Sequence, residues 1–371
     1  MLWPSGSRAH TPITTKILFN REVIRVFQGN CLGCHRPGGI AMSLATYEDA
    51  RPWAKAIKEE LLERRMPPWQ AVKGYGEFRN APALTQRDVD AIVNWVEGGA
   101  PKGDAKLLPP GPLFSTGWLL GEPDLALSPA ATSRVAADAD EHREFFLPTG
   151  LTAERWLTAV DLRPGEATVV HCAAVYLDGA RPALLGTWVP GQRAAALPEG
   201  IARRLPAHAR LRVRIHYRGA GEPVEDRSAI GLHFARTAAR RELREMTLIT
   251  SGGSVSLVEA AEALAIVPLA DPRLASVQAT VYRPDGTTEV LVWTGGHRDD
   301  WQPSYFFRNP VGLPRGSRVE AIAHLREPDE NGTGDVQREA PSPAEPLLTL
   351  FYTTLSRDRA GKPSGPSRPA S

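Results

Sequence analysis

Two cysteines and a histidine that lie close together constrain this chain more than any other feature of its sequence. Cys31, Cys34 and His35 form a C-x-x-C-H pattern. In this pattern the thiols can add to the two vinyl groups of a haem, and the imidazole can bind its iron as an axial ligand. The alternative interpretation is half of a zinc site, or a redox pair. A zinc site needs two further Cys or His ligands at similar spacing, and the only other cysteine is Cys172. The pattern therefore predicts covalently attached haem.

The residues around this motif have the apolar periodicity of helices. Three stripes predict three helices, formed by Phe19, Val23, Ile24 and Phe27 before the motif, by Trp53, Ile57 and Leu61 between Pro52 and Arg64, and by Val89, Ile92, Val93 and Val96 with Trp95 beside them. Thr85 and Asp88 have the spacing of a cap at the start of the third helix, and Gly98 and Gly99 follow its end. Three helices around one flat cofactor predict a small all-α domain.

A six-coordinate haem needs a second axial ligand, and two methionines lie within reach of the motif. Met42 follows His35 by only seven residues, whereas Met66 lies 31 residues beyond it. Pro67 and Pro68 fix φ and stiffen the chain that presents the Met66 sulfur. We therefore expect His35 and Met66 to be the iron ligands, and thioether ligation favours electron transfer over oxygen activation. The alternative role of Met66 is to fill a gap in the core.

Residues 16–104 resemble a class I cytochrome c domain. The resemblance is carried by the C-x-x-C-H motif, the helical stripes and the string RPGGIAMSLATYEDARPWAKAIKEELLERRMPPW. Similar strings stand at the front of large bacterial multidomain proteins. There the cytochrome precedes a module that resembles the copper type II, ascorbate-dependent monooxygenases, the family of peptidylglycine α-hydroxylating monooxygenase and dopamine β-monooxygenase. The resemblance implies a haem c-binding domain followed by a copper-monooxygenase-like module.

The chain changes character after the third predicted helix. Residues 105–121 are rich in Pro and Gly and predict a linker. Short apolar alternations separated by Gly, Pro and Asp then predict two antiparallel β-sandwich lobes, 122–250 and 251–355. Residues 356–371 lack large apolar side chains and predict a disordered tail. The predicted fold class is therefore multidomain, α then β: a small all-α cytochrome c domain, 16–104, followed by two jelly-roll-like β-sandwich lobes.

The resemblance implies two copper sites, and this sequence keeps part of one. In the family, one copper is bound by a His-His pair and by a later His-Tyr element; the corresponding positions are His171-Cys172 and His216. These three side chains are the candidate ligands of a residual copper site. Two strand histidines beside a buried thiol are the alternative. Because His216 alternates with Arg212 and Arg214, we expect it to face solvent or the neighbouring lobe.

The second copper of the family has no ligands in this chain. Its His-x-His pair corresponds to residues 269–271, which read Leu-Ala-Asp, and its methionine corresponds to Pro346. In the family this copper binds dioxygen and begins hydrogen abstraction, so the resemblance implies that hydroxylation has no centre here. Residues 301–305, Trp-Gln-Pro-Ser-Tyr, are similar to the family's C-terminal lobe. We therefore expect the fold of the module without its oxygen-activating ligands.

Composition and charge exclude several other functions. Lys and Arg number 44 against 42 Asp and Glu, a formal net charge of +2, and no block of like charge is long enough to follow a phosphate backbone. Nucleic acid is therefore not an expected partner. No run approaches the roughly 18 apolar residues of a membrane-spanning helix. The first residues, MLWPSGSRAHTP, show no secretory signal.

Three functions of different classes remain. We favour a haem c-binding electron-transfer protein that exchanges electrons with redox partner proteins, with the β module as a docking element or scaffold. The alternative is a copper- and haem-dependent oxidoreductase in which the haem supplies electrons to copper in the β module. The third is a non-redox binding module in which the cysteine motif is incidental. Covalent haem attachment resembles a process carried out outside the bacterial cytoplasm, so the first two imply a periplasmic or other extracytoplasmic location.

Overall fold

The computed structural model of the protein describes residues 15–355 except 113, 115–116, 193–194, 238, 250–252, 270, 272, 297–300 and 327–345. The predicted tail, 356–371, lies outside the described residues. The helical elements precede the strands along the chain. They are η1 (Phe19–Val23), α1 (Ile24–Asn30), α2 (Tyr47–Ala50), η2 (Arg51–Trp53), α3 (Ala54–Leu62), α4 (Gln86–Glu97) and η3 (Ala105–Leu107).

Within the described residues, the strands form a large eight-stranded sheet and three smaller sheets. The large sheet contains, in spatial order, β1 (Leu125–Leu127), β10 (Ala229–Phe234), β4 (Arg155–Arg163), β7 (Ile201–Leu205), β11 (Arg241–Ile249), β18 (Pro346–Thr354), β13 (Ala261–Pro268) and β16 (Tyr305–Leu313). One four-stranded sheet contains β3 (Asp140–Pro148), β8 (Arg210–Arg218), β5 (Val170–Leu177) and β6 (Ala183–Trp188). The other contains β12 (Ser254–Ser256), β17 (Arg318–Leu325), β14 (Leu274–Tyr282) and β15 (Thr288–Thr294). The two-stranded sheet pairs β2 (Ser133–Val135) with β9 (Val224–Asp226).

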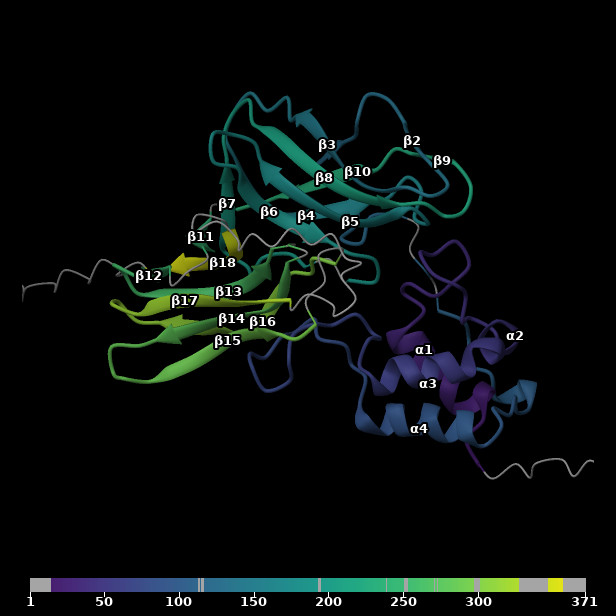
Figure 1. Cartoon of the computed structure of the whole chain (residues 1–371). Coiled ribbons are helices and arrows are strands. Elements are labelled where there is room, and N and C mark those ends of the chain that lie inside the picture. The colour runs from purple at the N-terminus through teal and green to yellow at the C-terminus, as the bar shows by residue number, and fades with distance from the viewer. Residues whose placement is uncertain are drawn as a thin grey trace, which may run out of the picture.

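Each four-stranded sheet packs on one half of the large sheet, and each of these contacts encloses an apolar core. One core lies between β3-β8-β5-β6 and the β1-β10-β4-β7 half, with Leu211, Ile215 and Leu232 buried in it. The other lies between β12-β17-β14-β15 and the β11-β18-β13-β16 half, with Leu291 and Leu348 buried in it. The two halves of the large sheet join where β7 and β11 pair in parallel. Figure 1 shows the two stacks of strands one above the other, with the helices to one side.

The helices have a small core of their own. Phe19 and Trp95 are fully buried with their ring centroids 5.9 Å apart, which joins η1 to α4. The predicted cap is confirmed at the start of α4, because Thr85 and Asp88 form both hydrogen bonds of a capping box. Trp95 and Ile92 form the buried side of α4. The sequence predicts Trp95 beside the apolar stripe of this helix, but in the structure it lies at the centre of the buried side. Trp53 was expected in the stripe of the second helix, but 46% of its surface is exposed.

The predicted fold class is wrong. Strand accounts for 41% of the described residues and helix for only 14%, in short segments that do not form a separate all-α cytochrome domain. The chain between α3 and α4 leaves the helices and enters the β region, where Ala71 forms a bridge with Thr294 and Phe78 with Phe307. Ala71 and Phe78 are buried in the core beneath β14 and β16. The segment between α3 and α4 therefore packs against strands that come much later in the chain. The β part is also continuous, because the large sheet takes strands from both predicted lobes.

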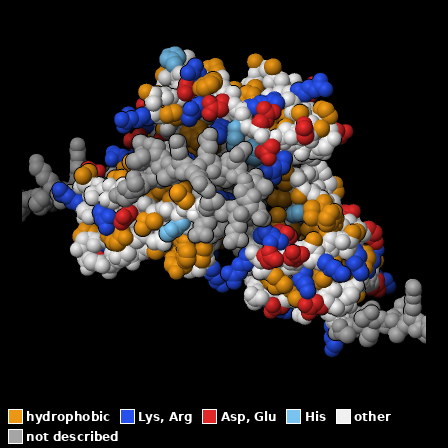
Figure 2. All heavy atoms as spheres, in the orientation of Figure 1, with side chains coloured by type: hydrophobic (Ala, Val, Ile, Leu, Met, Phe, Trp, Pro, Cys, Tyr) orange, Lys and Arg blue, Asp and Glu red, His pale blue; other side chains and the backbone are white. Residues whose placement is uncertain are grey.

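No helix in the described part of the chain is long and apolar enough to cross a membrane. On the face drawn in Figure 2, acidic and basic side chains are interspersed over the helical part and over the strands. This mixture of signs agrees with the small net charge of the whole chain, +2.

Candidate haem and histidine site

The C-x-x-C-H motif begins where α1 ends. Cys31 is the C-cap of α1, and its backbone N–H donates to the carbonyl of Phe27. The next turn is tight, since the backbone N–H groups of Cys34 and His35 both donate to the carbonyl of Cys31, at 3.1 and 2.9 Å. Local backbone hydrogen bonds thus hold the two thiols and the imidazole of the motif within one turn.

The ring of His35 is oriented by a hydrogen bond from its own loop. Its Nδ1 lies 3.0 Å from the carbonyl oxygen of Met42. A carbonyl can only accept, so Nδ1 carries the proton in this pair and Nε2 keeps its lone pair. Burial lowers the pKa of His35 below its usual range, and the bond to the Met42 carbonyl opposes this only in part. His35 is therefore held as a neutral imidazole whose Nε2 is able to bind a metal.

Both thiols of the motif are kept protonated by their surroundings. Burial, with a smaller contribution from Cys34, raises the pKa of Cys31 to about 12. Burial also raises the pKa of Cys34 to about 11, although the nearby Arg36 acts in the opposite direction. A redox-active C-x-x-C pair typically has a cysteine of lowered pKa, since only the thiolate is a strong nucleophile. Neither Cys31 nor Cys34 has a lowered pKa.

Cys34 contacts the β region directly. Its Sγ lies 3.4 Å from the carbonyl oxygen of Pro190, in the turn that follows β6. A Cβ atom added at Gly191 would lie 2.9 Å from the same sulfur, so a side chain there has no room. Cys34 also packs against an apolar cluster of Cys172, Val189 and Trp301. The haem motif and the third cysteine of the chain therefore belong to the same part of the structure.

Three histidines gather beside this cluster. Strand pairing places His216 of β8 opposite Cys172 of β5 and opposite His142 of β3. The rings of His142 and His216 are stacked with their centroids 4.5 Å apart, and the ring of His171 meets His216 edge-on at 5.4 Å. The ring of His171 also lies 5.6 Å from Trp301. The structure thus brings together all three predicted copper ligands, at the edge of the Cys34 contact.

The position of His216 differs from the prediction in one respect. Of its two expected surroundings, solvent and the neighbouring lobe, solvent is wrong, because its side chain is only 4% exposed. Its Nε2 lies 2.6 Å from Oδ1 of Asp140, and its Nδ1 is buried without a hydrogen-bond partner in the described structure. The alternation along β8 is real, but the rings of His142 and His171, from the neighbouring strands β3 and β5 of the same sheet, pack against the His216 ring. Strand alternation alone could not predict this packing.

The geometry of the histidines does not form a complete metal centre. Among the described residues, no group of three or more His, Cys, Asp or Glu side chains is arranged to hold a metal ion. His142, to which the sequence assigns no role, joins the cluster through the register of β3 and β8, which no spacing in the chain reveals. His233 lies on β10, which pairs with β1 and β4, away from β5 and β8.

Met66, the predicted second axial ligand, lies just after α3. Its backbone N–H donates to the carbonyl of Glu60 at 3.2 Å, and its side chain is half-buried. Met42, the other candidate, is 42% exposed, and its carbonyl is used by His35. The side chain of Met66 is therefore the more sheltered of the two methionines.

Comparisons with known proteins assign no family. No protein-family model and no curated protein matches the chain. It is similar to the major capsid protein of bacteriophage PM2 (12% identity, 63% of this chain and 98% of that chain, TM-score 0.27). It is also similar to a tandem CBM22 domain from Paenibacillus barcinonensis (8% identity, 66% and 99%, TM-score 0.16) and to a mutant of Bacillus subtilis oxalate decarboxylase (11% identity, 67% and 80%, TM-score 0.14). These TM-scores are too low to support a shared fold or function.

Proposed function

We propose that this chain is a haem c-binding electron-transfer protein. In this proposal Cys31 and Cys34 hold the haem through thioether bonds, and His35 and Met66 bind its iron. The observation that supports it most is the state of His35, a neutral imidazole with Nδ1 committed to the Met42 carbonyl and Nε2 left with its lone pair. When bound, the haem supplies a one-electron redox couple.

The two thiols also have the chemistry that attachment requires. Each S–H can add across one vinyl C=C bond, with sulfur joining one carbon and hydrogen the other, so no oxidant is needed. Their raised pKa values keep both thiols protonated at neutral pH. Attachment of this kind implies maturation outside the bacterial cytoplasm, so the proposed location is the periplasm or another extracytoplasmic compartment.

The β region is assigned a covering and docking role in this proposal. The turn at Pro190 and Gly191 lies against Cys34, so strands from the middle of the chain shelter one side of the motif. Exclusion of water from a redox centre alters its reduction potential, which makes this cover functional as well as structural. Redox partner proteins are the expected partners.

A second candidate is a copper- and haem-dependent oxidoreductase. One observation favours it: His171, Cys172 and His216 lie together and next to the cluster that Cys34 contacts. Thiolate and imidazole suit copper. It remains the second candidate for two reasons. The described side chains do not form a three-ligand group. Residues 269–271, Leu-Ala-Asp, and Pro346 stand where the resembled family has its oxygen-activating ligands.

One preparation tests both candidates. The full chain is produced in a host competent in c-type haem maturation, and covalent haem and copper per chain are measured with the oxidised and reduced absorption spectra. The first candidate predicts stoichiometric covalent haem, no stoichiometric copper, and an absorption band of the Met–iron bond that Met66→Ala removes. Met42→Ala is the matched control and keeps the band. Loss of the band in Met42→Ala alone would reassign the ligand.

The remaining outcomes separate the candidates. Covalent haem should be lost from Cys34→Ser and retained in Cys172→Ser. Tightly bound copper that is lost in His216→Ala and retained in His233→Ala would favour the oxidoreductase. A wild-type chain that carries no covalent haem under these conditions refutes both.

A further inference from the structure

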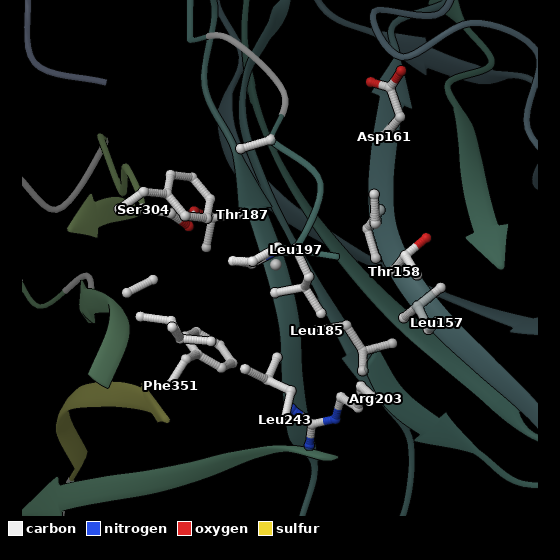
Figure 3. A pocket seen from close by; sticks show the side chains of 18 of the residues that line it. Leu157, Thr158, Asp161, Leu185, Thr187, Leu197, Arg203, Leu243, Ser304 and Phe351 are labelled. Carbon is white, nitrogen blue, oxygen red and sulfur yellow. The ribbon is translucent and has the colours of Figure 1, made fainter. Parts of the chain in front are cut away.

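A cavity of about 150 Å³ lies where the two halves of the molecule meet. Its walls come from β4, β6 and β7 on one side and from β11, β13, β16 and β18 on the other. In Figure 3 the side chains of Leu185, Leu197, Leu243 and Phe351 point toward one another across this space. The cavity is distinct from the site at Cys34, since none of the residues proposed to hold haem or copper lines it.

The apolar lining limits the size of a ligand. Leu185, Leu197, Leu243, Leu264 and Phe351 make most of the wall apolar. An apolar cavity of ~150 Å³ in another protein stays dry and binds benzene, so this volume suits one aromatic ring or an aliphatic group of similar size. Such a group would gain the dispersion contacts that an unfilled cavity lacks.

Two of the described charged side chains that line the cavity are buried and lie at its ends. Nη1 of Arg203 donates to Glu245 at 3.0 Å and to the carbonyl of Leu184 at 2.9 Å. Oδ2 of Asp161 accepts from the backbone N–H of Leu120 at 3.1 Å, and its Oδ1 is buried without a partner in the described structure. In Figure 3 Asp161 and Arg203 lie at opposite ends of the cavity, and the Asp161 carboxylate points away from the leucines between them. The apolar centre therefore holds neither charge.

Two arginines that line the cavity, Arg79 and Arg308, are exposed and mark its mouth. Both lie where the segment before α4 runs along β16, because the Arg79 N–H donates to the Phe306 carbonyl and the Arg308 N–H donates to the Glu77 carbonyl. The Arg308 side chain has a counter-charge, since Glu77 lies 4.0 Å away. No carboxylate in the described part of the chain forms an ion pair with Arg79. The mouth therefore carries one uncompensated positive charge.

The guanidinium of Arg79 reaches from one wall of the mouth to the other. Its Cζ lies 5.0 Å from the centroid of the Phe306 ring, which belongs to the β16 wall. Its Nη2 donates at 3.4 Å to the carbonyl of Ala196, which stands between the lining residues Ala195 and Leu197. Burial lowers the pKa of Arg79, because part of the water that would stabilise its charge is excluded. A carboxylate at the mouth could accept from the remaining N–H groups and offset this loss of hydration.

A negative group at the mouth is attracted by Arg79 more than it is repelled by Asp161. The Leu197 N–H donates to the Thr158 carbonyl, so the Arg79 contact lies level with Thr158 on β4. Asp161 is three residues further along this strand, on the order of 10 Å away at ~3.3 Å per residue. Coulomb energy falls inversely with distance, so an ion pair at ~4 Å is roughly twice as strong as a repulsion at ~10 Å. A positive group in the same place would be repelled by Arg79.

We propose that this cavity binds a small carboxylate that carries one apolar group, either a single aromatic ring or a short aliphatic chain. The apolar group lies among the leucines and Phe351, and the carboxylate accepts hydrogen bonds from the guanidinium of Arg79 at the mouth. This site does not depend on the haem, and its test is independent of the outcome at Cys34.

The probes are phenylacetate, benzyl alcohol and benzylamine, which share one ring and differ in charge. Their binding to the full chain is measured by calorimetry. We expect phenylacetate to bind roughly three- to tenfold more tightly than benzyl alcohol, the ratio that a partly exposed ion pair supplies, and benzylamine to bind most weakly. Arg79→Gln should remove the advantage of phenylacetate and leave benzyl alcohol binding unchanged. Arg87→Gln is the matched control, because Arg87 is an exposed arginine of α4 outside the cavity, and it should keep that advantage.

A second variant tests the location of the site. Ala265 lines the cavity and is buried, so Ala265→Leu should fill the space and abolish binding of all the probes. If this variant does not fold, Leu185→Phe fills the same cavity from β6.

Several results would overturn the proposal. One is a wild-type chain that does not bind phenylacetate, and another is an Arg79→Gln variant that keeps the preference for it. Unchanged binding to the filled variant would place the probes elsewhere. Tighter binding of benzylamine than of phenylacetate, lost in Asp161→Asn, would show that the cavity selects a cation at Asp161 instead.

Discussion

Replacing Gly191 by alanine tests the contact between the β region and the cysteine motif. Gly191 has φ +74°, and an added Cβ would lie 2.9 Å from Sγ of Cys34. Gly150 is the matched control, because its φ is +69° and an added Cβ there meets nothing within 4 Å. Both substitutions carry the left-handed backbone cost of about 1–2 kcal/mol. Only Gly191→Ala adds a contact well inside the ~3.5–4.0 Å at which heavy atoms attract best.

The size of the added cost depends on whether Cys34 can move. A free thiol can turn about χ1, and a side chain about 30° off its rotamer costs about 0.5–1.5 kcal/mol. A thioether bonded to haem is fixed at both ends, so the clash must be relieved by backbone shifts, which cost about 1–3 kcal/mol. We therefore expect Gly191→Ala to destabilise the haem-free protein only slightly more than Gly150→Ala does. The excess should be larger, by about 1 kcal/mol or more, once haem is attached.

The measurement is the free energy of unfolding in urea for both variants, each in haem-free and haem-attached form. Equal destabilisation by the two variants in both forms would show that the turn at Gly191 does not press on Cys34. An equal excess in the two forms would show that attachment does not fix the Cys34 sulfur. The first result would refute the contact between the motif and the β region, and the second would refute its dependence on haem attachment.

Three further predictions concern stability and thiol chemistry. In haem-free protein the pKa values of Cys31 and Cys34 are raised above the ordinary value of 9.0, so their contribution to stability is present below about pH 9 and falls as pH rises toward about 11. The free energy of unfolding should be lower at pH 11 than at pH 9, and the variant with both Cys31→Ser and Cys34→Ser should lack this decrease. Asp226→Asn should cost about 1–3 kcal/mol in urea unfolding, because this buried carboxylate accepts from backbone N–H groups and from the hydroxyl of Tyr217, whereas exposed Asp285→Asn should cost less. Trp95→Ala should cost about 3–5 kcal/mol in the same assay, since it empties the centre of the helical core, and a cost below about 1 kcal/mol would contradict that packing.

Features that depend on near neighbours along the chain could be predicted from the sequence. The capping box of Thr85 and Asp88 is such a feature, because its two hydrogen bonds span three residues. The turn of the cysteine motif is another, since the His35 N–H bonds to the carbonyl of Cys31. The apolar alternation along β8 is also visible in the sequence and is observed as burial. Helix periods, caps and strand alternation arise from interactions between residues only a few positions apart.

Which of these segments come into contact could be seen only in the folded chain. Cys34 contacts Pro190 across 156 positions of sequence, and Phe78 enters a β core rather than the helical one. His142 reaches His216 only through the register of β3 with β8. The sequence therefore indicated the haem motif and the histidines separately, but neither their proximity nor the continuous eight-stranded sheet. Strand pairing and the packing of distant apolar faces depend on the whole chain, and no spacing between residues encodes them.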